Sequence, residues 1–415
     1  MEKKVLLVLG GNRLSCDIVK NARSMGIYTI VTDWNSPEIS PAKTIADESW
    51  NTSLLDYNKL LSQIQEAKVN GIITGFTDSY LLPYQHLCEL TGLPCYATKE
   101  QFELTLDKRA FKQLCKKYGV GVVPEYDSSS FNPSIISNNN SVLLKPVDNS
   151  GSRGIFICNN PDDFERLRTA TLSFSQKGEI LIEKYMQCDD VSFEYKIQDG
   201  EVSLSSICDR YIHKTGDIGS VTSGLIYPSK YLVRYKEQVD KKVKQMFEGI
   251  GLKNGVLFMQ AFVDEMGFYF YEMGYRLSGG RHYIFTDNQN NDSSIKQLIN
   301  FAFTGSMDKR RISDFAIPGF KDTCCQLSVI CKSTKIGYIE GLEAISSYPE
   351  IIDVLMSYQE GDTVGKQGTS ASIVARIHIV AKDEKHLIKV LVKIKQEFHI
   401  LDEAGDDMII DFFHP

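Results

Sequence analysis

The chain has 415 residues, of which 42% are hydrophobic and 24% charged, and its formal net charge is −7. This composition is typical of a soluble globular protein, and the length exceeds one typical hydrophobic core, so we expect two or three domains. The acidic balance gives no basic surface for nucleic acid or an anionic membrane, and neither is expected as a partner.

The N-terminus and the cysteines indicate a reducing compartment. Met1–Lys4 lead directly into the apolar run Val5–Leu9 without a signal-peptide pattern, and no apolar run approaches the roughly 18 residues of a spanning helix. The ten cysteines include no CxxC pair, and the seven histidines show no metal-ligand spacing. We therefore expect a cytoplasmic protein with reduced cysteines and no zinc.

Residues 1 to about 105 alternate strand and helix patterns. Strands are expected at Val5–Leu9, Tyr28–Thr32 and Gly71–Thr74, and helices at 14–25, 54–67 and 77–90. This alternation predicts an open, mostly parallel α/β sheet.

A glycine turn follows the first of these strands, and Asp33 follows the second. The pair resembles part of a dinucleotide-binding unit, but the turn Gly10-Gly11-Asn12-Arg13-Leu14-Ser15 lacks the third glycine of GxGxxG. A nicotinamide oxidoreductase is therefore only an alternative. The turn could also begin a helix whose N-terminus faces an anion.

The pattern changes at Thr105. A helix begins at Asp107-Lys108-Arg109, and the strand Val142–Pro146 carries Lys145 directly before the Gly/Ser-rich stretch 148–154. The next strand is Ile155–Cys158, and strand–loop–strand is not the order of a P-loop. Backbone N–H groups in such a loop can form an anion-binding nest, and an anion would explain a lysine in a buried strand. A flexible hairpin tip is the alternative.

The pattern of residues 180–249 predicts the strands of a second sheet. Strands are expected at 180–182, 190–195 and 202–207, a polar loop at 213–224 and one helix at 231–249. The two-residue period places Asp190, Ser192 and Glu194 on one face.

The segment Leu257–Arg276 reads as a hairpin with two apolar runs around Asp264–Gly267. If Asp264 pairs with Phe268, Gln260 lies opposite Glu272. The same face then carries Gly274, Arg276, Phe258, Phe262, Phe268 and Phe270. A carboxylate and a guanidinium among aromatic rings need partners, so they bind a ligand or form a structural ion pair with each other.

The last hundred residues predict a small α+β unit. Its strands are expected at 325–331, 373–380 and 408–413 and its helix at 384–398; before it, residues 277–282 are expected to form a loop that leads into a helix at 295–303. Residues 337–349 and 361–368 are expected to be loops or turns. A lid or interface domain is the modest interpretation.

The ordered set of these features resembles the ATP-grasp superfamily of carboxylate–amine ligases, which includes biotin carboxylase, carbamoyl phosphate synthetase, glycinamide ribonucleotide synthetase and L-amino acid ligases. The resemblance covers nearly the whole chain. It implies a Rossmann-like pre-ATP-grasp domain over 1–105, an ATP-grasp domain over 106–310 with its flap subdomain at about 120–190, and a C-terminal α+β domain over 311–415.

The resemblance also implies an ATP site. Lys108 and Lys145 match the two lysines that contact phosphates, and Asp190 falls where the family binds the ribose. The glycine-rich flap matches Ser150, Gly151, Ser152 and Gly154. The adenine hinge matches Glu183, Lys184, Tyr185 and Met186.

For the metal, Glu272 resembles the principal Mg²⁺ ligand of the ExNxR signature and Arg276 its arginine; Mn²⁺ is a possible substitute. Gln260 stands where the family has a second acid, and Gly274 replaces the asparagine. Gln260 offers an uncharged carbonyl oxygen, which implies a weaker metal site or a degenerate enzyme.

The implied activity is ATP-dependent joining of a carboxylate, such as an amino acid, to an amine through an acyl phosphate, with release of ADP and phosphate. Lys145, Glu272 and Arg276 are implied to be catalytic, and Arg210, Arg276, Gly279 and Gly280 to contact substrate. The alternative is an ATP-binding regulatory or scaffold protein with a degenerate metal site. The partners are small carboxylates and amines, with a homodimer possible.

Overall fold

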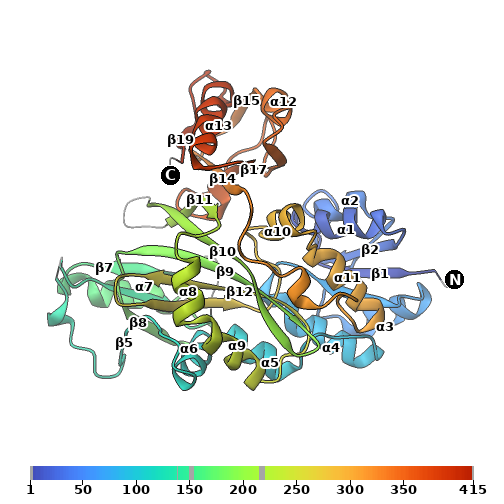
Figure 1. The fold of residues 1–415 in the computed structure, drawn as a ribbon, viewed down its shortest axis with the longest axis horizontal. Coiled ribbons are helices and arrows are strands. Elements are labelled where there is room, and N and C mark those ends of the chain that lie inside the picture. The colour runs from blue at the N-terminus through green and yellow to red at the C-terminus, as the bar shows by residue number, and fades with distance from the viewer. Residues whose placement is uncertain (1–2, 138, 149–153, 215–219, 414–415) are drawn as a thin grey trace.

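The computed structural model describes residues 3–137, 139–148, 154–214 and 220–413 (Figure 1). Three of the flap residues named above, Ser150, Gly151 and Ser152, lie outside the described residues. Over the described ranges, no helix has the length and apolar character needed to cross a membrane.

The first sheet confirms the predicted parallel α/β unit. Its strand order is β3-β2-β1-β4, and each neighbouring pair is parallel. The strands are β1 (Val5–Leu9), β2 (Tyr28–Asp33), β3 (Glu48–Asn51) and β4 (Gly71–Thr74). The helices are α1 (Ser15–Ser24), α2 (Pro41–Ile45), α3 (Tyr57–Glu66), α4 (Leu81–Thr91) and α5 (Lys99–Leu106). The edge strand β3 was missed because only Trp50 of its four residues is buried.

A smaller antiparallel sheet follows, with strand order β5-β8-β6-β7. Its strands are β5 (Glu125–Tyr126), β6 (Val142–Pro146), β7 (Phe156–Cys158) and β8 (Ile180–Lys184). Helix α7 (Phe164–Leu172) packs its apolar side on this sheet and gives it a core of its own. Helix α6 (Lys108–Lys117) precedes the sheet, and its N-cap Asp107 accepts hydrogen bonds from the N–H groups of Arg109 and Ala110.

The largest sheet is antiparallel and continues into the C-terminal part of the chain (Figure 1). Its order is β13-β12-β9-β10-β11-β14-β17-β16, with β19 beside β14. The strands are β9 (Asp189–Gln198), β10 (Glu201–Lys214), β11 (Ser220–Tyr227), β12 (Gly255–Val263), β13 (Phe268–Gly274), β14 (Thr323–Cys331), β16 (Ile351–Met356), β17 (Ile373–Ala381) and β19 (Ile409–Asp411). Because β14 pairs with β11, the C-terminal strands extend the same sheet.

Helices and a small ribbon complete the fold. The helices are α8 (Leu232–Gln238), α9 (Asp240–Gly249), α10 (Tyr283–Asn290), α11 (Ser294–Thr304), α12 (Leu342–Ser346) and α13 (Glu384–Glu397). The ribbon pairs β15 (Ile336–Glu340) with β18 (His399–Asp402). Helices α8 and α9 cover one face of the large sheet through Tyr235 and Phe247, which contact Phe193 and Tyr195.

Three sequence predictions are wrong. The described residues of the expected loop at 213–224 are strand, because β10 runs to Lys214, β11 begins at Ser220, and the two pair, for example Ile212 with Thr222; residues 215–219 lie outside the described residues. The expected helix at 231–249 is two helices, since Val239 leaves helical geometry at φ −130°. The expected loop at 337–349 contains β15 and α12. Gly341, at φ +76°, makes the sharp turn between them, where a side chain would strike the Glu397 carbonyl.

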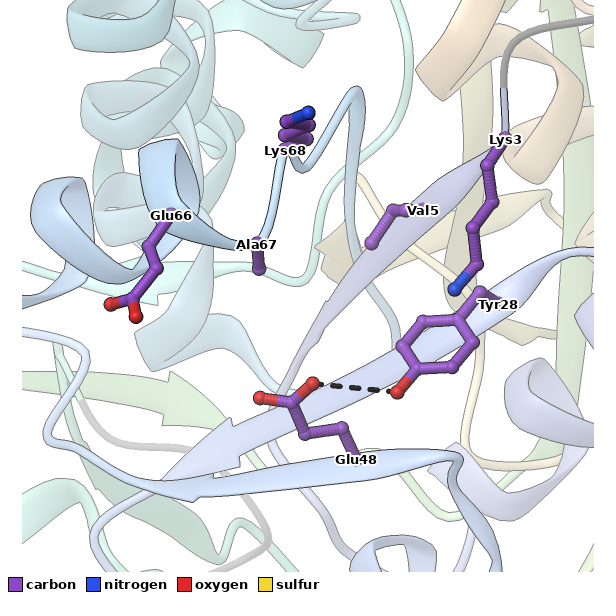
Figure 2. Close-up of a pocket in the computed structure, with 7 residues that line it drawn as sticks. All are labelled: Lys3, Val5, Tyr28, Glu48, Glu66, Ala67 and Lys68. Atoms are coloured by element: carbon purple, nitrogen blue, oxygen red, sulfur yellow. Dashed lines mark hydrogen bonds between the residues drawn. The ribbon is translucent and has the colours of Figure 1, made fainter.

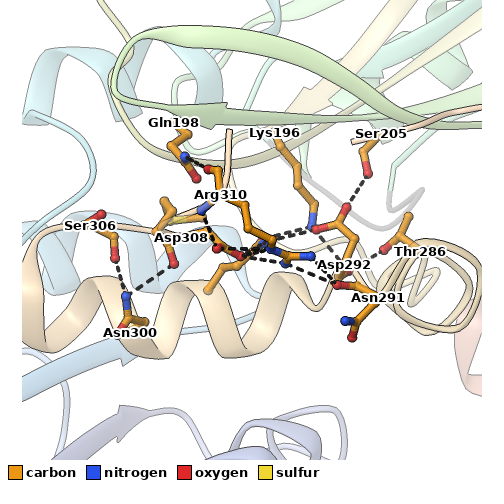
Figure 3. Close-up of polar contacts among 12 residues, drawn as sticks. Lys196, Gln198, Ser205, Thr286, Asn291, Asp292, Asn300, Ser306, Asp308 and Arg310 are labelled. Atoms are coloured by element: carbon orange, nitrogen blue, oxygen red, sulfur yellow. Dashed lines mark hydrogen bonds and ion pairs between the residues drawn. The ribbon is translucent and has the colours of Figure 1, made fainter. Parts of the chain in front are cut away.

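A buried polar network joins α10 and α11 to the large sheet (Figure 3). Lys196 on β9 contacts the Asp292 carboxylate and lies 2.9 Å from Gln297 Oε1, and Ser205 donates to the other Asp292 oxygen. Charges removed from water are tolerated only with such complete pairing. The network explains Lys196 as a structural residue that fixes the helices behind the candidate site.

Candidate functional site

The β12–β13 hairpin places Gln260 opposite Glu272, as the sequence predicted. The tip differs from the prediction, since Phe268 pairs with Val263 and not with Asp264. A β-bulge between the Gln260 and Ala261 pairs absorbs the difference, and Tyr271 is the extra residue. The bulge therefore restores the expected register at the functional end of the hairpin.

The bulge also corrects the predicted face. Phe268 and Phe270 point to the opposite side of the sheet, where they contact Phe193 and Tyr235, so their assignment to the Glu272 face is wrong. Tyr271 takes a place on the candidate face and stacks on Phe262 with ring centroids 4.6 Å apart.

Glu272 is half-buried, and its carboxylate has no hydrogen bond or ion pair within the described parts of the chain. It lies near Lys108: burial lowers the pKa of Lys108, and Glu272 is the first group that opposes this shift. A partly buried carboxylate without a fixed protein partner, close to a lysine, is suited to a cation or a charged ligand.

Arg276 does not form the structural ion pair with Glu272 that the sequence left open. Its Nε and Nη2 each lie 2.6 Å from an oxygen of Asp78, in the first part of the chain. Its guanidinium also lies 5.0 Å from the centre of the Phe258 ring. One edge of the planar Arg276 guanidinium therefore already binds a carboxylate, that of Asp78, and Arg276 does not neutralise Glu272.

The two lysines expected on phosphates, Lys108 and Lys145, lie near each other, since burial and then Lys145 lower the pKa of Lys108. Lys145 Nζ lies 2.9 Å from Glu183 Oε1, and Lys112 Nζ lies 2.6 Å from the same oxygen. Burial alone would raise the pKa of Glu183, but Lys145 and Lys112 outweigh it and hold that pKa below its usual value. Lys112 was missed; its position one helical turn after Lys108 on α6 is the signal that would have found it.

The expected adenine hinge follows Glu183 along β8. The N–H of Lys184 donates to the Pro124 carbonyl at 2.9 Å, and the N–H of Tyr185 donates to the Ser141 carbonyl at 3.0 Å. Both donors are therefore occupied by the chain. Of the hinge N–H groups, Met186 is the one left to be considered for a base.

Asp190 and Arg210 are cross-strand neighbours on β9 and β10. Arg210 Nη1 lies 3.0 and 2.8 Å from the two Asp190 oxygens, and Tyr271 Oη lies 3.1 Å from each. Arg210 Nη2 also donates to Thr222 Oγ1 at 3.1 Å. Burial raises the pKa of Asp190, with Arg210 opposing that shift. The expected ribose acid and the expected substrate arginine thus bind each other.

The loop at 277–282 is tied into the fold. The N–H of Gly280 donates to Ser278 Oγ at 3.1 Å, and the Arg281 guanidinium contacts both Asp17 and Asp353. His282 Nδ1 lies 2.6 Å from Tyr227 Oη. Gly279 and Gly280 remain half-buried beside this anchored segment.

Asp33 does not support a nicotinamide site. It is buried, and one oxygen accepts from the Gly11 N–H at 2.8 Å and from Ser40 Oγ at 2.7 Å. Lys43 Nζ lies 2.9 Å from the other oxygen. A carboxylate with this many partners is a structural clamp on the glycine turn, and a ribose would have to displace them.

A surface cavity of about 450 Å³ lies elsewhere, between β1, β2, β3 and the end of α3 (Figure 2). Val5 and Tyr28, which line it, begin their strands, so the cavity is at the amino ends of the parallel strands. Ligands of open α/β sheets bind at the carboxyl ends. This cavity is therefore separate from the candidate site.

The donor set fits a magnesium ion that keeps most of its water. No group of three or more His, Cys, Asp or Glu side chains suited to a metal occurs in the described ranges. Glu272 and Gln260, both half-buried and directly opposed, offer a carboxylate and an amide oxygen. Mg²⁺ is usually held by one or two carboxylates together with water and substrate phosphates, and this pair matches that pattern.

Sequence comparison finds a family and several curated relatives that are similar to this chain. A model described as the ATP-grasp domain matches residues 138–282. The chain is 24% identical over 200 residues to a methylcrotonoyl-CoA carboxylase alpha subunit from Dictyostelium discoideum, a match that covers 44% of this chain and 28% of that protein. It is 21% identical over 266 residues to an L-arginine-specific L-amino acid ligase from Bacillus subtilis, covering 62% of each. The chain thus spans less than two thirds of these relatives.

Solved structures share the fold over almost the whole chain. An L-amino acid ligase from Bacillus licheniformis superposes with a TM-score of 0.79 at 15% identity, covering 97% of this chain and all of that one, 100%. The biotin carboxylase domain dimer of a 2-oxoglutarate carboxylase from Hydrogenobacter thermophilus, in complex with MgADP, ADP and bicarbonate, superposes with a TM-score of 0.75 at 20% identity. That match covers 96% of this chain and 91% of the other.

Proposed function

We propose that this chain, which has the ATP-grasp fold with an ATP-grasp domain over residues 138–282, is an ATP-dependent carboxylate–amine ligase. The observation that carries the proposal is the half-buried Glu272 carboxylate, without a protein partner in the described residues and close to Lys108. The proposal includes the three-part division at 1–105, 106–310 and 311–415 and the site roles below.

The proposed reaction has two steps. A carboxylate oxygen of the first substrate attacks the γ-phosphorus of ATP, and ADP leaves. The amine of the second substrate then attacks the acyl carbon, phosphate leaves, and the amine loses a proton. Phosphoryl transfer depends mainly on positioning and on neutralising charge, so the first step needs cations around the phosphates and no protein nucleophile.

The lysines are proposed to hold the phosphates. Lys108 begins α6, and Lys145 is the last residue but one of β6, before the flap; the two are near enough for Lys145 to add to burial in lowering the pKa of Lys108. Glu183 forms an ion pair with Lys145, and this pair is proposed to hold the Lys145 ammonium in position to bind a phosphate oxygen. The Gly154 end of the flap is proposed to cover the phosphates.

The base and ribose are proposed to lie along β8 and β9. Because Lys184 and Tyr185 have committed their N–H groups, Met186 is proposed as the donor to the adenine edge. The Asp190 carboxylate reaches a ribose hydroxyl only alongside its existing bonds to Arg210 and Tyr271.

Glu272 and Gln260 are proposed to hold Mg²⁺, which when bound would neutralise the β- and γ-phosphates. Arg276, held over Phe258 by Asp78, is proposed to present to the transferring group or the first carboxylate the N–H groups that Asp78 and the Leu277 carbonyl leave unused. Gly279 is proposed to contribute its N–H to the developing oxyanion, whereas the Gly280 N–H is already bound by Ser278.

A carboxylase is the second candidate, because biotin carboxylase structures share the fold. The two reactions use the same first step on different acids. Both superpositions cover almost the whole chain, and the support for the ligase is the higher TM-score of the L-amino acid ligase, 0.79 against 0.75.

The deciding experiment measures ADP release with ATP and Mg²⁺ in two arms. One arm contains pooled L-amino acids, and the other contains bicarbonate with free biotin. Stimulation in the first arm, with a hydroxamate formed when hydroxylamine is added, supports the ligase. Stimulation only by bicarbonate and biotin supports the carboxylase. ATP binding without ADP in either arm supports the regulatory alternative, and AMP with pyrophosphate contradicts the ATP-grasp mechanism.

A further inference from the structure

Arg376 on β17 has a half-buried side chain between Ser328 of β14 and Leu355 of β16. Across the described parts of the chain, no hydrogen bond or ion pair engages its guanidinium. Other arginines near the candidate site are each paired with a carboxylate: Arg210 with Asp190, Arg276 with Asp78, and Arg281 with Asp17 and Asp353.

The surroundings of Arg376 favour an added negative charge. Burial, and then the neighbouring Arg281, lower the pKa of Arg376 to about 10, and only Tyr283 opposes them. The carboxylates of Asp17 and Asp353 accept hydrogen bonds from Arg281 and form no ion pair with Arg376. A guanidinium held next to another cation without a counter-charge costs stability until an anion binds it.

Among the described residues, the acids that bind the neighbouring Arg281 form no ion pair with Arg376. Asp353 contacts Arg281 and also lies 3.1 Å from His378 Nδ1. His378, two residues from Arg376 on the same face of β17, is buried, and burial lowers its pKa. The β14 residues opposite Arg376 and His378 are Ser328 and Gln326, which are both uncharged. The required anion therefore comes from outside this part of the chain.

Arg376 lies on the same face of the sheet as Asp353, which binds Arg281 of the loop proposed to bind the reacting acyl group. A side chain at Gly280 would lie 3.4 Å from Leu225 of β11, so this loop rests on the large sheet, and Arg281 reaches β16 through Asp353. The phosphate-binding lysines belong to α6 and β6, in another part of the site. Arg376 therefore belongs to the side of the site that β16, β17 and this loop form, and the lysines belong to the side that α6 and β6 form.

We propose that Arg376 binds a carboxylate that the amine substrate retains, so that the enzyme selects an amine that is also an acid, such as an amino acid. The inference rests on the proposed ligase function. A guanidinium binds a carboxylate through two parallel hydrogen bonds, which supplies orientation as well as charge. The amine of such a substrate then points toward Gly279 and the acyl phosphate.

The first test requires no turnover. Titration calorimetry with MgADP present compares the L-amino acids, one at a time, with their carboxamides. It uses the wild type, Arg376→Gln, Arg376→Lys and the control Lys382→Gln, which removes the same charge from the exposed Lys382 on the segment after β17. At least one amino acid should bind ten times more tightly than its amide to the wild type and to Lys382→Gln. Arg376→Gln should reduce this preference to below twofold, and Arg376→Lys should keep part of it.

The second test separates the two substrates. In the ligase assay, Arg376→Gln should raise the KM of the amino acid used as amine at least tenfold, while the KM of hydroxylamine, which has no carboxylate, changes less than twofold. Equal binding of acids and amides by the wild type, or an unchanged preference in folded Arg376→Gln, would overturn the inference. Arg376-dependent carboxylate binding without any ADP release would support the site and reject the proposed reaction.

Discussion

Glu272 lies directly opposite Gln260 because Tyr271 is an extra residue in β13. Without the bulge, the observed pairing of Val263 with Phe268 would put Tyr271 opposite Gln260 and turn Glu272 to the other face. The same extra residue brings Tyr271 to Asp190. One bulge therefore sets both the proposed metal pair and the contact of Tyr271 with the Asp190–Arg210 pair beside it.

Replacing Gln260 by Glu should tighten the metal site. A second carboxylate opposite Glu272 adds attraction for Mg²⁺, which is at most roughly 4 kcal/mol at an effective dielectric of about 20, before repulsion from Glu272 is subtracted. We expect a net gain of about 1.4 kcal/mol, a tenfold lower Mg²⁺ concentration for half-maximal ADP release. Gln260→Met, which removes the oxygen, should shift the midpoint in the opposite direction.

The melting temperature distinguishes a purely structural role for Gln260 from a role as a metal ligand. If residue 260 only packs against its neighbours, Gln260→Glu should lower the melting temperature and leave the Mg²⁺ midpoint unchanged. That result would remove the main support for Glu272 as a ligand.

Replacing Lys145 by Ala should weaken ATP binding and also destabilise the fold. The sequence suggested a lysine used only on phosphate, but Lys145 neutralises the buried Glu183. Because Lys112 still pairs with Glu183, we expect the free energy of unfolding to fall by about 2 kcal/mol, which is less than the roughly 3–5 kcal/mol lost when a buried ion pair is fully broken. Urea denaturation and nucleotide titration measure the two effects.

The double variant Lys145→Met/Glu183→Gln separates the effect on ATP binding from the effect on stability. It leaves no unpaired charge at position 183, so at least half of the lost stability should return while ATP affinity stays at least tenfold below the wild type. Wild-type ATP affinity in the folded double variant would show that Lys145 serves only Glu183.

Replacing Asp78 by Asn should lower kcat through Arg276. The amide cannot accept both hydrogen bonds from the guanidinium fork, so Arg276 loses its fixed position over Phe258. We expect kcat to fall at least tenfold with the KM for ATP within twofold, and Arg276→Lys to behave similarly. A faster Asp78→Asn enzyme would mean instead that Asp78 competes with substrate for Arg276.

Glu194 should make stability depend on pH. It is fully buried, one of its oxygens has no hydrogen-bond partner, and burial raises its pKa to about 7. Unfolded glutamate titrates near 4.3, so the folded state holds a proton that the unfolded state releases between these values. The contribution of Glu194 to stability is therefore present below about pH 4 and is lost as pH rises through about 7, on the order of 4 kcal/mol in total.

Glu194→Gln removes this ionisation. Measured by urea denaturation, the variant should gain stability relative to the wild type between pH 5 and pH 8, with the larger difference at pH 8. An equal difference at both pH values would show that the pKa of Glu194 is not raised.

Much of the architecture follows from local patterns. The alternation of apolar strands and amphipathic helices predicted the parallel first sheet, and the two-residue period of 257–276 predicted that Gln260 and Glu272 face each other. The glycine turn and Asp33 were identified together, but their role as a mutual clamp was not. These successes depend on neighbours in sequence, for which hydrophobic periodicity is a sufficient guide.

The sequence by itself determined which residue types were available for the site, and the tertiary structure decided which of them are already paired. Arg276 meets Asp78 across 198 residues, and Lys145 shares Glu183 with Lys112 of another element. Glu272 has no such protein partner in the described chain. Charge pairing acts over a few ångströms, and only the packing of distant segments sets those distances, so no local pattern distinguishes a paired carboxylate from one left for a ligand.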